Sequence, residues 1–368
     1  MIPVTRTTLP PLPDYLALLQ KAWDSRWITN HGELHNQLEA DLRAHLRSPP
    51  VRLLSNGTIA IHIALRALRL KGEVITTPFT FSATTNAIVW EGLTPVFADV
   101  DPRTHNLDPA DVERKITDRT TGILAVHVYG NPCDTVALEE LAQRHGLKVI
   151  YDAAHAFGVE HQGRSVLDWG DLSTLSFHAT KVFHTVEGGA AVASDPALLE
   201  QVALMRNNGI RNEVQVLLPG TNAKLSEMHA AMGLALLPGM EERIAARRRL
   251  HEQYRRGLAG AGVEFQHLVA TRNNYAYMPI VLPSNEARER LHHALLAKDI
   301  KSRRYFYPLT SSAAYFPPGT TQAAKVPVAA SLSDRVLCLP MYAELETAEA
   351  DQVIEETVRI LAKPLLTP

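Results

Sequence analysis

Between about residues 50 and 195, short apolar, β-branched runs alternate with stretches that have helical periodicity. The runs predict strands at 51–54, 73–77, 95–100, 122–130, 148–152 and 173–177, and the intervening pattern predicts helices at 59–68 and 139–146. Strands that alternate with helices need crossover connections, which give a mostly parallel sheet with helices on both faces. The pattern therefore predicts an α/β fold.

The pattern changes after this region. Residues 226–237 predict a buried helix and residues 239–260 a long amphipathic one, whose arginines 247–249 we expect on a solvated face. A strand at 275–283 and helices at 285–300 and 347–363 follow. We expect two domains, an N-terminal segment with a large domain over residues 1–244 and a smaller C-terminal α+β domain over residues 245–368.

Composition narrows the class of protein. The chain has 368 residues, of which 46% are hydrophobic, and a formal net charge of -2 at pH 7. It lacks the basic face that binding to nucleic acid or an anionic membrane requires. The N-terminus has no apolar signal-peptide core, and no run approaches the roughly 18 apolar residues of a membrane span. Only Cys133 and Cys338 occur, without metal-type spacing, so we expect a cytoplasmic protein.

Ligands of parallel sheets gather where the strands end, so the residues after each run are the candidates for chemistry. Ser55-Asn56-Gly57-Thr58 breaks a strand and leads directly into an apolar helix. The free amides of such a helix start suit a phosphate group. A simple helix cap by Asn56 or Thr58 is the alternative.

A second strand ends at Asp152, among alanines. A buried acid needs a partner, and the protonated ring nitrogen of pyridoxal phosphate (PLP) is one that makes the burial useful. A helix cap by Asp152 is equally compatible with the local pattern. His155 either lies over a cofactor ring or is an ordinary buried, hydrogen-bonded histidine.

Lys181 lies between a predicted strand and a glycine pair, flanked by Phe177, Val182, Phe183 and two histidines. Burial pushes a lysine toward its neutral form, which can attack a carbonyl and form a Schiff base. A purely structural lysine is the other interpretation.

Phe79 and Phe81 follow another strand and are candidates to stack on a planar cofactor, with core packing as the alternative for each. Each of these signals is weak alone, but together they describe one PLP site. Five histidines lie along the same strand ends, at 127, 155, 161, 178 and 184, but without HExxH or comparable ligand spacing, so we expect no metal site.

Several motifs, in this order, resemble those of the PLP-dependent sugar-nucleotide aminotransferases of the DegT/StrS type. They are SNGTIAIHIALRAL, TTPFTFSATTNAIVWEG, PVFADVD, AVHVYGNPCD, VIYDAAHAFG, SFHATKVFHTVEGGAAV, GTNAKLSEMHAAMGLALL and LPMYAELE. The resemblance runs nearly end to end. It implies the fold-type I, aspartate aminotransferase-like architecture and a homodimer whose active sites lie between the subunits.

The resemblance also implies roles for individual residues. Lys181 would carry the cofactor and Asp152 would pair with its ring nitrogen, with His178 near the substrate. The residues implied to bind the cofactor are Gly57, Thr58, Ile59, Phe81, Asp152, His155, Ser176, Lys181 and, from the neighbouring subunit, Asn222. Trp27, Arg303, Arg304, Tyr305 and Tyr307 would contact the nucleotide part of the substrate. His155 stands where many relatives have glutamine.

The implied reaction is transfer of the amino group of L-glutamate to a nucleotide-linked keto sugar. The motifs SRWITNHGELHNQLE, VYGNPCD and SFHATKVFHTVEGG resemble most those of the viosamine-forming enzymes, which aminate carbon 4 of dTDP-4-keto-6-deoxy-D-glucose in deoxyamino-sugar biosynthesis, as for lipopolysaccharide O-antigens. Amination at carbon 3 of a dTDP-3-keto-6-deoxyhexose is the alternative. A non-catalytic regulatory or scaffold protein of the same fold is a more remote one, against which Lys181 and Asp152 argue.

Overall fold

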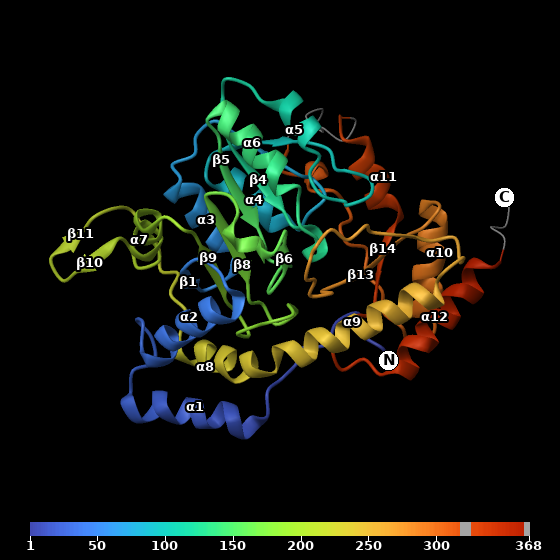
Figure 1. Ribbon diagram of the computed structural model, residues 1–368, viewed down its shortest axis with the longest axis horizontal. Helices are drawn as coiled ribbons and strands as arrows, with labels where there is room; N and C mark the ends of the chain where they lie inside the picture. The colour runs from blue at the N-terminus through green and yellow to red at the C-terminus, as the bar shows by residue number, and fades with distance from the viewer. Residues whose placement is uncertain (317–324, 364–368) are drawn as a thin grey trace.

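The computed structural model describes residues 1–316 and 325–363, and its centre is a seven-stranded sheet (Figure 1). The strand order is β1 (Val51–Leu54), β9 (Gly189–Val192), β8 (Leu172–Ser176), β5 (Lys148–Asp152), β4 (Thr120–Val126), β2 (Glu73–Thr76) and β3 (Thr94–Phe97). Of these strands only β9 runs antiparallel to its neighbours. The predicted mostly parallel α/β sheet is confirmed.

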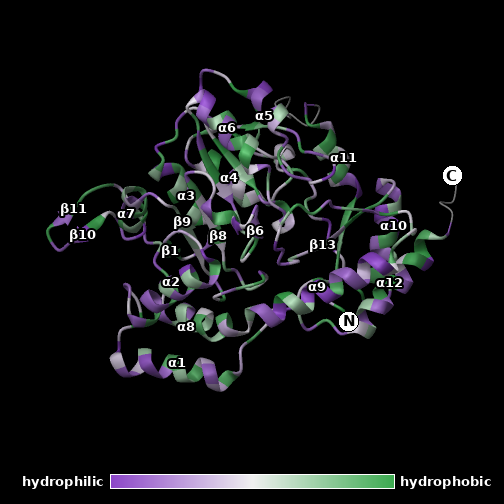
Figure 2. Cartoon of the chain, in the orientation of Figure 1, coloured by the Kyte–Doolittle hydropathy of each residue, from purple (hydrophilic) through white to green (hydrophobic). Residues whose placement is uncertain are grey.

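Helices cover both faces of this sheet, because neighbouring strand residues are buried on opposite sides. Val74 packs with α3 (Gly57–Ala67), α4 (Ser82–Trp90) and α7 (Pro196–Met205), whereas Ile75 packs in a separate core with α5 (Pro109–Lys115) and α6 (Thr135–His145). The strands accordingly appear as mostly apolar in Figure 2. This double burial is what makes their sequences continuously apolar rather than alternating.

Two N-terminal helices that the sequence analysis did not identify cover the β1 and β9 side of the sheet. They are α1 (Leu12–Ser25) and α2 (Glu33–Leu46), and both pack against α8 (Glu227–Leu236). Glu227 fixes the start of α2, because its carboxylate accepts hydrogen bonds from the backbone N–H groups of Leu34 (2.8 Å) and His35 (3.0 Å). A carboxylate at a helix N-terminus also interacts favourably with the helix dipole.

Gly32, the residue that precedes α2, permits this close approach. A Cβ atom at Gly32 would lie 2.5 Å from Cδ of Glu227, so we expect Gly32→Ala to lower the free energy of unfolding by about 1–3 kcal/mol. Gly239→Ala is the matched control, since Gly239 also precedes a helix with negative φ but its added Cβ meets only the flexible end of Arg243. Urea unfolding measures both variants, and equal losses would contradict the clash.

The second part of the chain forms a three-stranded antiparallel sheet with helices beside it. The strands are β12 (Glu264–Phe265), β13 (Met278–Val281) and β14 (Val336–Leu339); the helices are α9 (Met240–Gly257), α10 (Asn285–Leu296), α11 (Pro327–Arg335) and α12 (Thr347–Leu361). α9 connects this part to the large sheet (Figure 1). The predicted domain boundary between residues 244 and 245 falls within α9, and the division into two domains stays a prediction. Residues 317–324 and 364–368 of the predicted second domain lie outside the described chain.

The expectation that arginines 247–249 form a solvated face was wrong for Arg247. Its side chain is buried, and its guanidinium donates to the carbonyl oxygens of Met341 (3.2 Å) and Ala276 (3.5 Å). An arginine among other charged residues of an amphipathic helix is expected to face solvent. Here the carbonyl oxygens of two other chain segments replace water as hydrogen-bond acceptors for Arg247.

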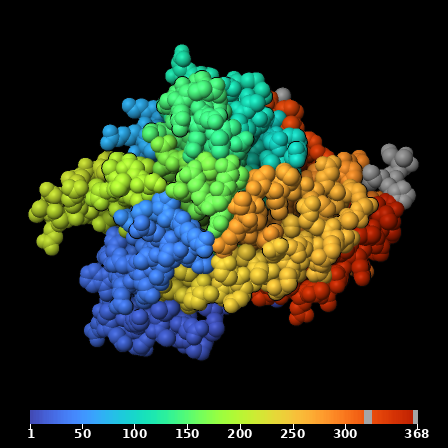
Figure 3. Space-filling model, viewed as in Figure 1, coloured from blue at the N-terminus to red at the C-terminus, as the bar shows by residue number. Residues whose placement is uncertain are grey.

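The remaining elements are short. They are the hairpins β6 (Glu160–His161) with β7 (Arg164–Ser165) and β10 (Ile210–Asn212) with β11 (Gln215–Val216), and single 3₁₀ turns at Val128–Gly130, Val166–Asp168, Leu237–Gly239 and Thr310–Ser312. The β10–β11 hairpin projects from the body of the molecule (Figures 1 and 3). Within the described residues, no helix has the length and apolarity that crossing a membrane requires.

Candidate active site

A cavity of about 240 Å³ opens where β1, β5 and β8 end. Most of the predicted site residues line it: Gly57, Thr58, Phe81, Asp152, His155, Ser176, His178, Lys181, Arg303 and Tyr305. They come from separate stretches of the chain and meet because parallel strands end at one edge of the sheet. The remaining predicted residues, Trp27, Ile59, Asn222, Arg304 and Tyr307, do not line this cavity.

The N-terminus of α3 forms one end of the cavity. Asn56 caps the helix by accepting a hydrogen bond from the N–H of Ile59 (2.8 Å), so the amide of Ile59 is already used. The first amides, those of Gly57 and Thr58, have no carbonyl of the preceding turn to bind. Gly57 is required here, since a Cβ would lie 2.8 Å from Cβ of Ser176 at the end of β8. The two open interpretations are compatible: the helix is capped and still offers amides to an anion.

Asp152 ends β5 as a buried carboxylate that faces the cavity. Its oxygens accept hydrogen bonds from the hydroxyl of Thr84 (2.8 Å) and the N–H of Ala154 (3.1 Å). Burial raises the pKa of Asp152, and these two hydrogen bonds and the charge of Lys181 oppose that rise. A cationic partner in the cavity would stabilise the ionised form.

Lys181 follows β8 and lines the cavity. Its Nζ lies 3.5 Å from the hydroxyl oxygen of Tyr277 on the segment before β13. Burial lowers the pKa of Lys181 to about 8, although the nearby Asp152 carboxylate raises it. More of this amine than of a solvated lysine is therefore neutral, and hence nucleophilic, near neutral pH, and the neutral share rises as the pH approaches 8.

His155 is a neutral histidine at this site. Burial and, secondarily, the charge of Lys181 lower its pKa well below the usual value. The N–H of Tyr129 donates to its Nδ1 (3.3 Å), which places the ring proton on Nε2. Its ring packs against Phe306 with parallel planes and against the edge of Tyr277. His155 is thus both buried and hydrogen-bonded, and it also lines the cavity.

The structure separates the two phenylalanines. Phe79 is fully buried and packs edge-on against Tyr129 and Phe306, so its role is core packing. Phe81 is 52% exposed and lines the cavity, where it can cover the face of a planar ligand.

His178 lies at the rim. Its ring is half exposed, its Nδ1 is 2.8 Å from the hydroxyl of Thr180, and its Nε2 is 3.7 Å from the carboxylate of Glu187. In this position it is available to a substrate that enters the cavity.

The arginine and tyrosine segment at 303–307 divides into two groups. Arg303 and Tyr305 line the cavity, and the guanidinium of Arg303 lies 4.0 Å from the centroid of the Tyr305 ring and makes no ion pair among the described residues. Arg304 instead pairs with Glu289 (2.5 Å), and Tyr307 packs under the guanidinium of Arg288. Arg304 and Tyr307 therefore lie outside the cavity of their own chain, and their predicted contacts with the substrate stay a prediction.

Trp27 and Asn222 are exposed and lie outside the cavity of their own chain. Trp27 is in the connection between α1 and α2, and the side-chain oxygen of Asn222 accepts a hydrogen bond from Lys224 (2.8 Å).

Two contacts in the site were missed by the sequence analysis. Thr84 orients Asp152 through its hydroxyl, which also lies 3.0 Å from the hydroxyl of Thr80. The sequence signal for Thr84 is only its spacing of four residues from Thr80. Tyr277 contacts Lys181 from 96 residues away along the chain, within a run that reads simply as a strand. Among the described residues no cluster of three or more histidine, cysteine or acidic side chains could hold a metal ion.

The chain is similar in sequence to known aminotransferases. The sequence model of the DegT/DnrJ/EryC1/StrS aminotransferase family matches residues 13–358. The dTDP-4-amino-4,6-dideoxy-D-glucose transaminase of Shigella dysenteriae is 42% identical over 361 residues, which cover 97% of this chain and 98% of that enzyme.

Solved structures show the same fold. DesI, crystallised in the presence of its TDP-sugar product, superposes with a TM-score of 0.90 at 33% identity, covering 98% of this chain and 93% of DesI. NtdA from Bacillus subtilis with bound cofactor PMP superposes with a TM-score of 0.87 at 27% identity, covering 96% of this chain and 82% of NtdA. The chain belongs to the DegT/DnrJ/EryC1/StrS aminotransferase family.

Proposed function

We propose that this chain uses pyridoxal phosphate to transfer the amino group of L-glutamate to carbon 4 of dTDP-4-keto-6-deoxy-D-glucose, which yields dTDP-4-amino-4,6-dideoxy-D-glucose. The observation that carries the chemistry is one cavity in which a half-buried lysine, a buried carboxylate and the free amides of a helix N-terminus meet. The choice of sugar rests on the 42% identical transaminase named for this product.

The cavity residues fit this cofactor group by group. The amides of Gly57 and Thr58, with the hydroxyl of Ser176 beside them, would hold the phosphate. Asp152 would hold the ring nitrogen, and Phe81 and His155 would lie against the ring. Pyridoxal phosphate, when bound, supplies an aldehyde that carries amino groups and a ring that withdraws electrons from the reacting carbon.

Asp152 and Lys181 have different roles in proton transfer. Asp152, fixed by Thr84 and Ala154, would keep a proton on the ring nitrogen of the cofactor, the form in which the ring withdraws electrons best. Nζ of Lys181 takes the proton from the α-carbon of glutamate and returns a proton to the sugar carbon in the second half of the reaction. The hydroxyl of Tyr277 keeps this amine near the position where both carbons are presented.

The guanidinium of Arg303, which lines the cavity, binds the diphosphate of the nucleotide sugar. It makes no ion pair within the described chain, so its charge is free to bind an anion. Both cysteines are buried and free, which agrees with the reducing cytoplasm where we place the enzyme.

The proposed enzyme is a homodimer with shared active sites. By the family resemblance, Asn222 completes the phosphate site of the other subunit and Trp27 contacts the substrate. Both residues are exposed and outside the cavity of their own chain, as contacts across subunits require. Large apolar side chains are exposed in nearby parts of the chain, among them Trp23 on α1 and Val214 and Val216 on the projecting hairpin. Such surfaces favour burial against a second copy.

A visible absorption spectrum, followed by product analysis, tests this proposal. Purified protein loaded with pyridoxal phosphate is expected to show a visible band that bleaches when L-glutamate is added. The dTDP-4-keto sugar should then restore the band and become an amino sugar, whose NMR spectrum locates the new amine. A missing band would overturn the cofactor assignment, and an amine at carbon 3 would overturn the choice of sugar.

A further inference from the structure

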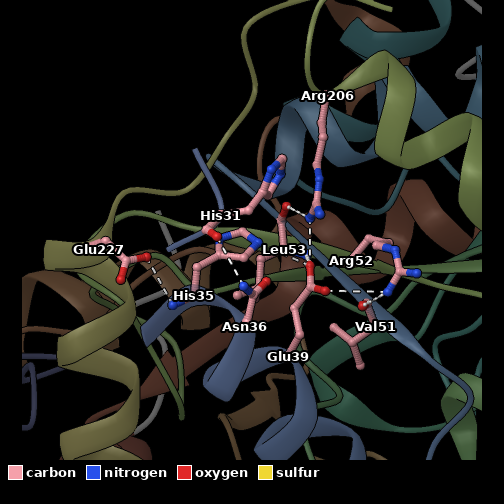
Figure 4. Close-up of polar contacts among 9 residues, drawn as sticks. All are labelled: His31, His35, Asn36, Glu39, Val51, Arg52, Leu53, Arg206 and Glu227. Atoms are coloured by element: carbon pink, nitrogen blue, oxygen red, sulfur yellow. Dashed lines mark hydrogen bonds and ion pairs between the residues drawn. The ribbon is translucent and has the colours of Figure 1, made fainter. Parts of the chain in front are cut away.

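A buried ion pair lies outside the cavity, at the junction of three segments that are distant in the sequence (Figure 4). Glu39 on α2 accepts hydrogen bonds at one carboxylate oxygen from Arg206, which follows α7 (2.6 Å), and from the N–H of Leu53 on β1 (2.9 Å). The same nitrogen of Arg206 also donates to the carbonyl oxygen of Leu53 (2.7 Å). The side chains of Arg206 and Glu39 are only 6% and 14% exposed.

The pair is strongly coupled to its surroundings. Burial would raise the pKa of Glu39, but the hydrogen bond with His35 and the charge of Arg206 hold the pKa at about 2. Arg52 approaches the second carboxylate oxygen from the more exposed side (3.4 Å). Removing Glu39 would leave Arg206 as a buried charge without its ion-pair partner, whereas removing Arg206 would leave Glu39 with Arg52 and His35. Neither Glu39 nor Arg206 lines the cavity, so the pair does not serve it directly.

Arg206 instead holds the segment that carries Asn222. Its carbonyl oxygen accepts a hydrogen bond from the N–H of Ala223 (2.9 Å), and Asn207 and Asn222 form a β-bridge beside it. The carbonyl oxygen of Ala223 in turn accepts from the N–H of Ser55 (2.9 Å), just before the α3 N-terminus. The segment 221–223 is therefore fixed between Arg206 and β1, with the Asn222 side chain left exposed.

A second contact ties this segment to the connection that carries Trp27. Glu227 follows shortly after Asn222, and its N–H donates to the carbonyl oxygen of Ile28 (3.0 Å). Its carboxylate caps α2, the helix from which Glu39 projects (Figure 4). The ion pair and the helix cap thus connect the segment that carries Asn222 with the segment that carries Trp27. Both segments lie outside the cavity of this chain.

We propose that Glu39 and Arg206 are a positioning pair that fixes segment 221–223 so that Asn222 meets the cofactor phosphate of a second copy of this chain. This inference rests on the homodimer of the proposed function. It adds that a buried pair in one subunit controls cofactor binding in the other. Neither residue touches the cofactor, and both act through the backbone that they hold.

The first experiment measures the concentration of pyridoxal phosphate that half-saturates the visible band. Arg206→Met is expected to raise this concentration about 3- to 10-fold, because one phosphate contact is lost. Arg206→Lys should stay within about twofold of wild type, since both contacts come from a single nitrogen that an ammonium can replace. Arg52→Met is the matched control, because Arg52 pairs with the same carboxylate but has no contact with segment 221–223. An equal loss in Arg52→Met would overturn the inference.

Heterodimers in which only one chain keeps Lys181 then show whether the Glu39–Arg206 pair affects the cofactor site of its own subunit or that of the other subunit. Two differently tagged chains are co-expressed, one with Lys181→Ala, so that only the other chain can form the band. When Arg206→Met lies on the Lys181→Ala chain, the inference expects weak cofactor binding at the intact Lys181. When Arg206→Met lies on the chain with Lys181, binding should equal that of wild type. The reverse pattern, or equal weakening in both arrangements, would overturn the inference.

Asn222→Ala in the same two arrangements separates this inference from the proposed function. If Asn222→Ala weakens binding only from the Lys181→Ala chain and Arg206→Met does not, the shared site stands and the positioning role is removed. If Asn222→Ala acts within its own chain, the shared site itself fails and the inference fails with it. The wild-type band, recorded in parallel, reports on the cofactor assignment alone.

Discussion

Replacing Lys181 by alanine is expected to lower the rate of amino-group transfer by at least about 10²–10⁴-fold, the usual contribution of a positioned acid–base group. Alanine offers neither an amine for the cofactor aldehyde nor a carrier for the proton that leaves the α-carbon of glutamate. The structure provides no second amine at this point, since among the described residues Lys181 is the lysine that lines the cavity. Steady-state turnover with L-glutamate and the dTDP-4-keto sugar measures the effect.

Two further variants interpret that loss. Lys181→Arg keeps length and charge, but a guanidinium does not lose its proton in proteins, so the same loss is expected. Tyr277→Phe keeps the amine and removes only a 3.5 Å hydrogen bond, so turnover should fall by no more than about tenfold. Turnover of Lys181→Ala within tenfold of wild type would mean that another group moves the proton.

The strands and the polar residues after them were predictable from the sequence, because they depend on local pattern and one topological rule. Apolar runs locate the strands, and parallel strands that end at one edge bring Gly57, Asp152 and Lys181 together. The cavity confirms this convergence. The roles of the individual residues came from the resemblance, since each local motif also fitted a simple helix cap or core residue.

The residues that hold the site were not predictable in the same way. Thr84 and Tyr277 reach Asp152 and Lys181 through contacts between distant segments, and nothing in their own neighbourhood marks them. Phe79 and Phe81 are two residues apart, so a continued strand would put both side chains on one side. The chain has left β2 before them and Phe81 directly precedes α4, which is why Phe79 is buried while Phe81 lines the cavity. Helix α2 did carry a signal that was overlooked, with leucines every four residues at 34, 38, 42 and 46.

Buried ion pairs such as that of Glu39 with Arg206 are still harder to predict from the sequence. These two residues are 167 positions apart, and each taken alone resembles a solvated surface charge. Arg247 shows the same difficulty, since its sequence context is a run of arginines on an amphipathic helix while the fold buries it. The pattern of the sequence indicates where charges occur, but burial depends on which carbonyl and carboxylate oxygens the fold brings to them.

Asp152→Asn should lower kcat by about 10²–10³-fold with the fold intact, in the range of other losses of a single electrostatic group in an active site. Asparagine has the same shape: its oxygen can accept from the N–H of Ala154, and its NH₂ group can donate to the hydroxyl of Thr84, which reverses that hydrogen bond. It carries no charge, however, to hold a proton on the cofactor ring nitrogen. Thermal unfolding should therefore change little while turnover falls. Burial raises the pKa of Asp152, so the folded protein gains little stability from this charge, and the uncharged variant should fold as well as wild type.

Asp99 provides the matched control for this prediction. It is also a buried acid just after a strand of the sheet, β3, but its carboxylate accepts hydrogen bonds from the N–H groups of Val328 and Ala329 at the start of α11 and does not line the cavity. Asp99→Asn should lower the free energy of unfolding and leave kcat of the folded enzyme within about twofold of wild type, because its hydrogen bonds serve a helix terminus. If both variants lost activity equally, the buried charge of Asp152 would matter through stability. A loss confined to Asp152→Asn assigns the charge to the cofactor.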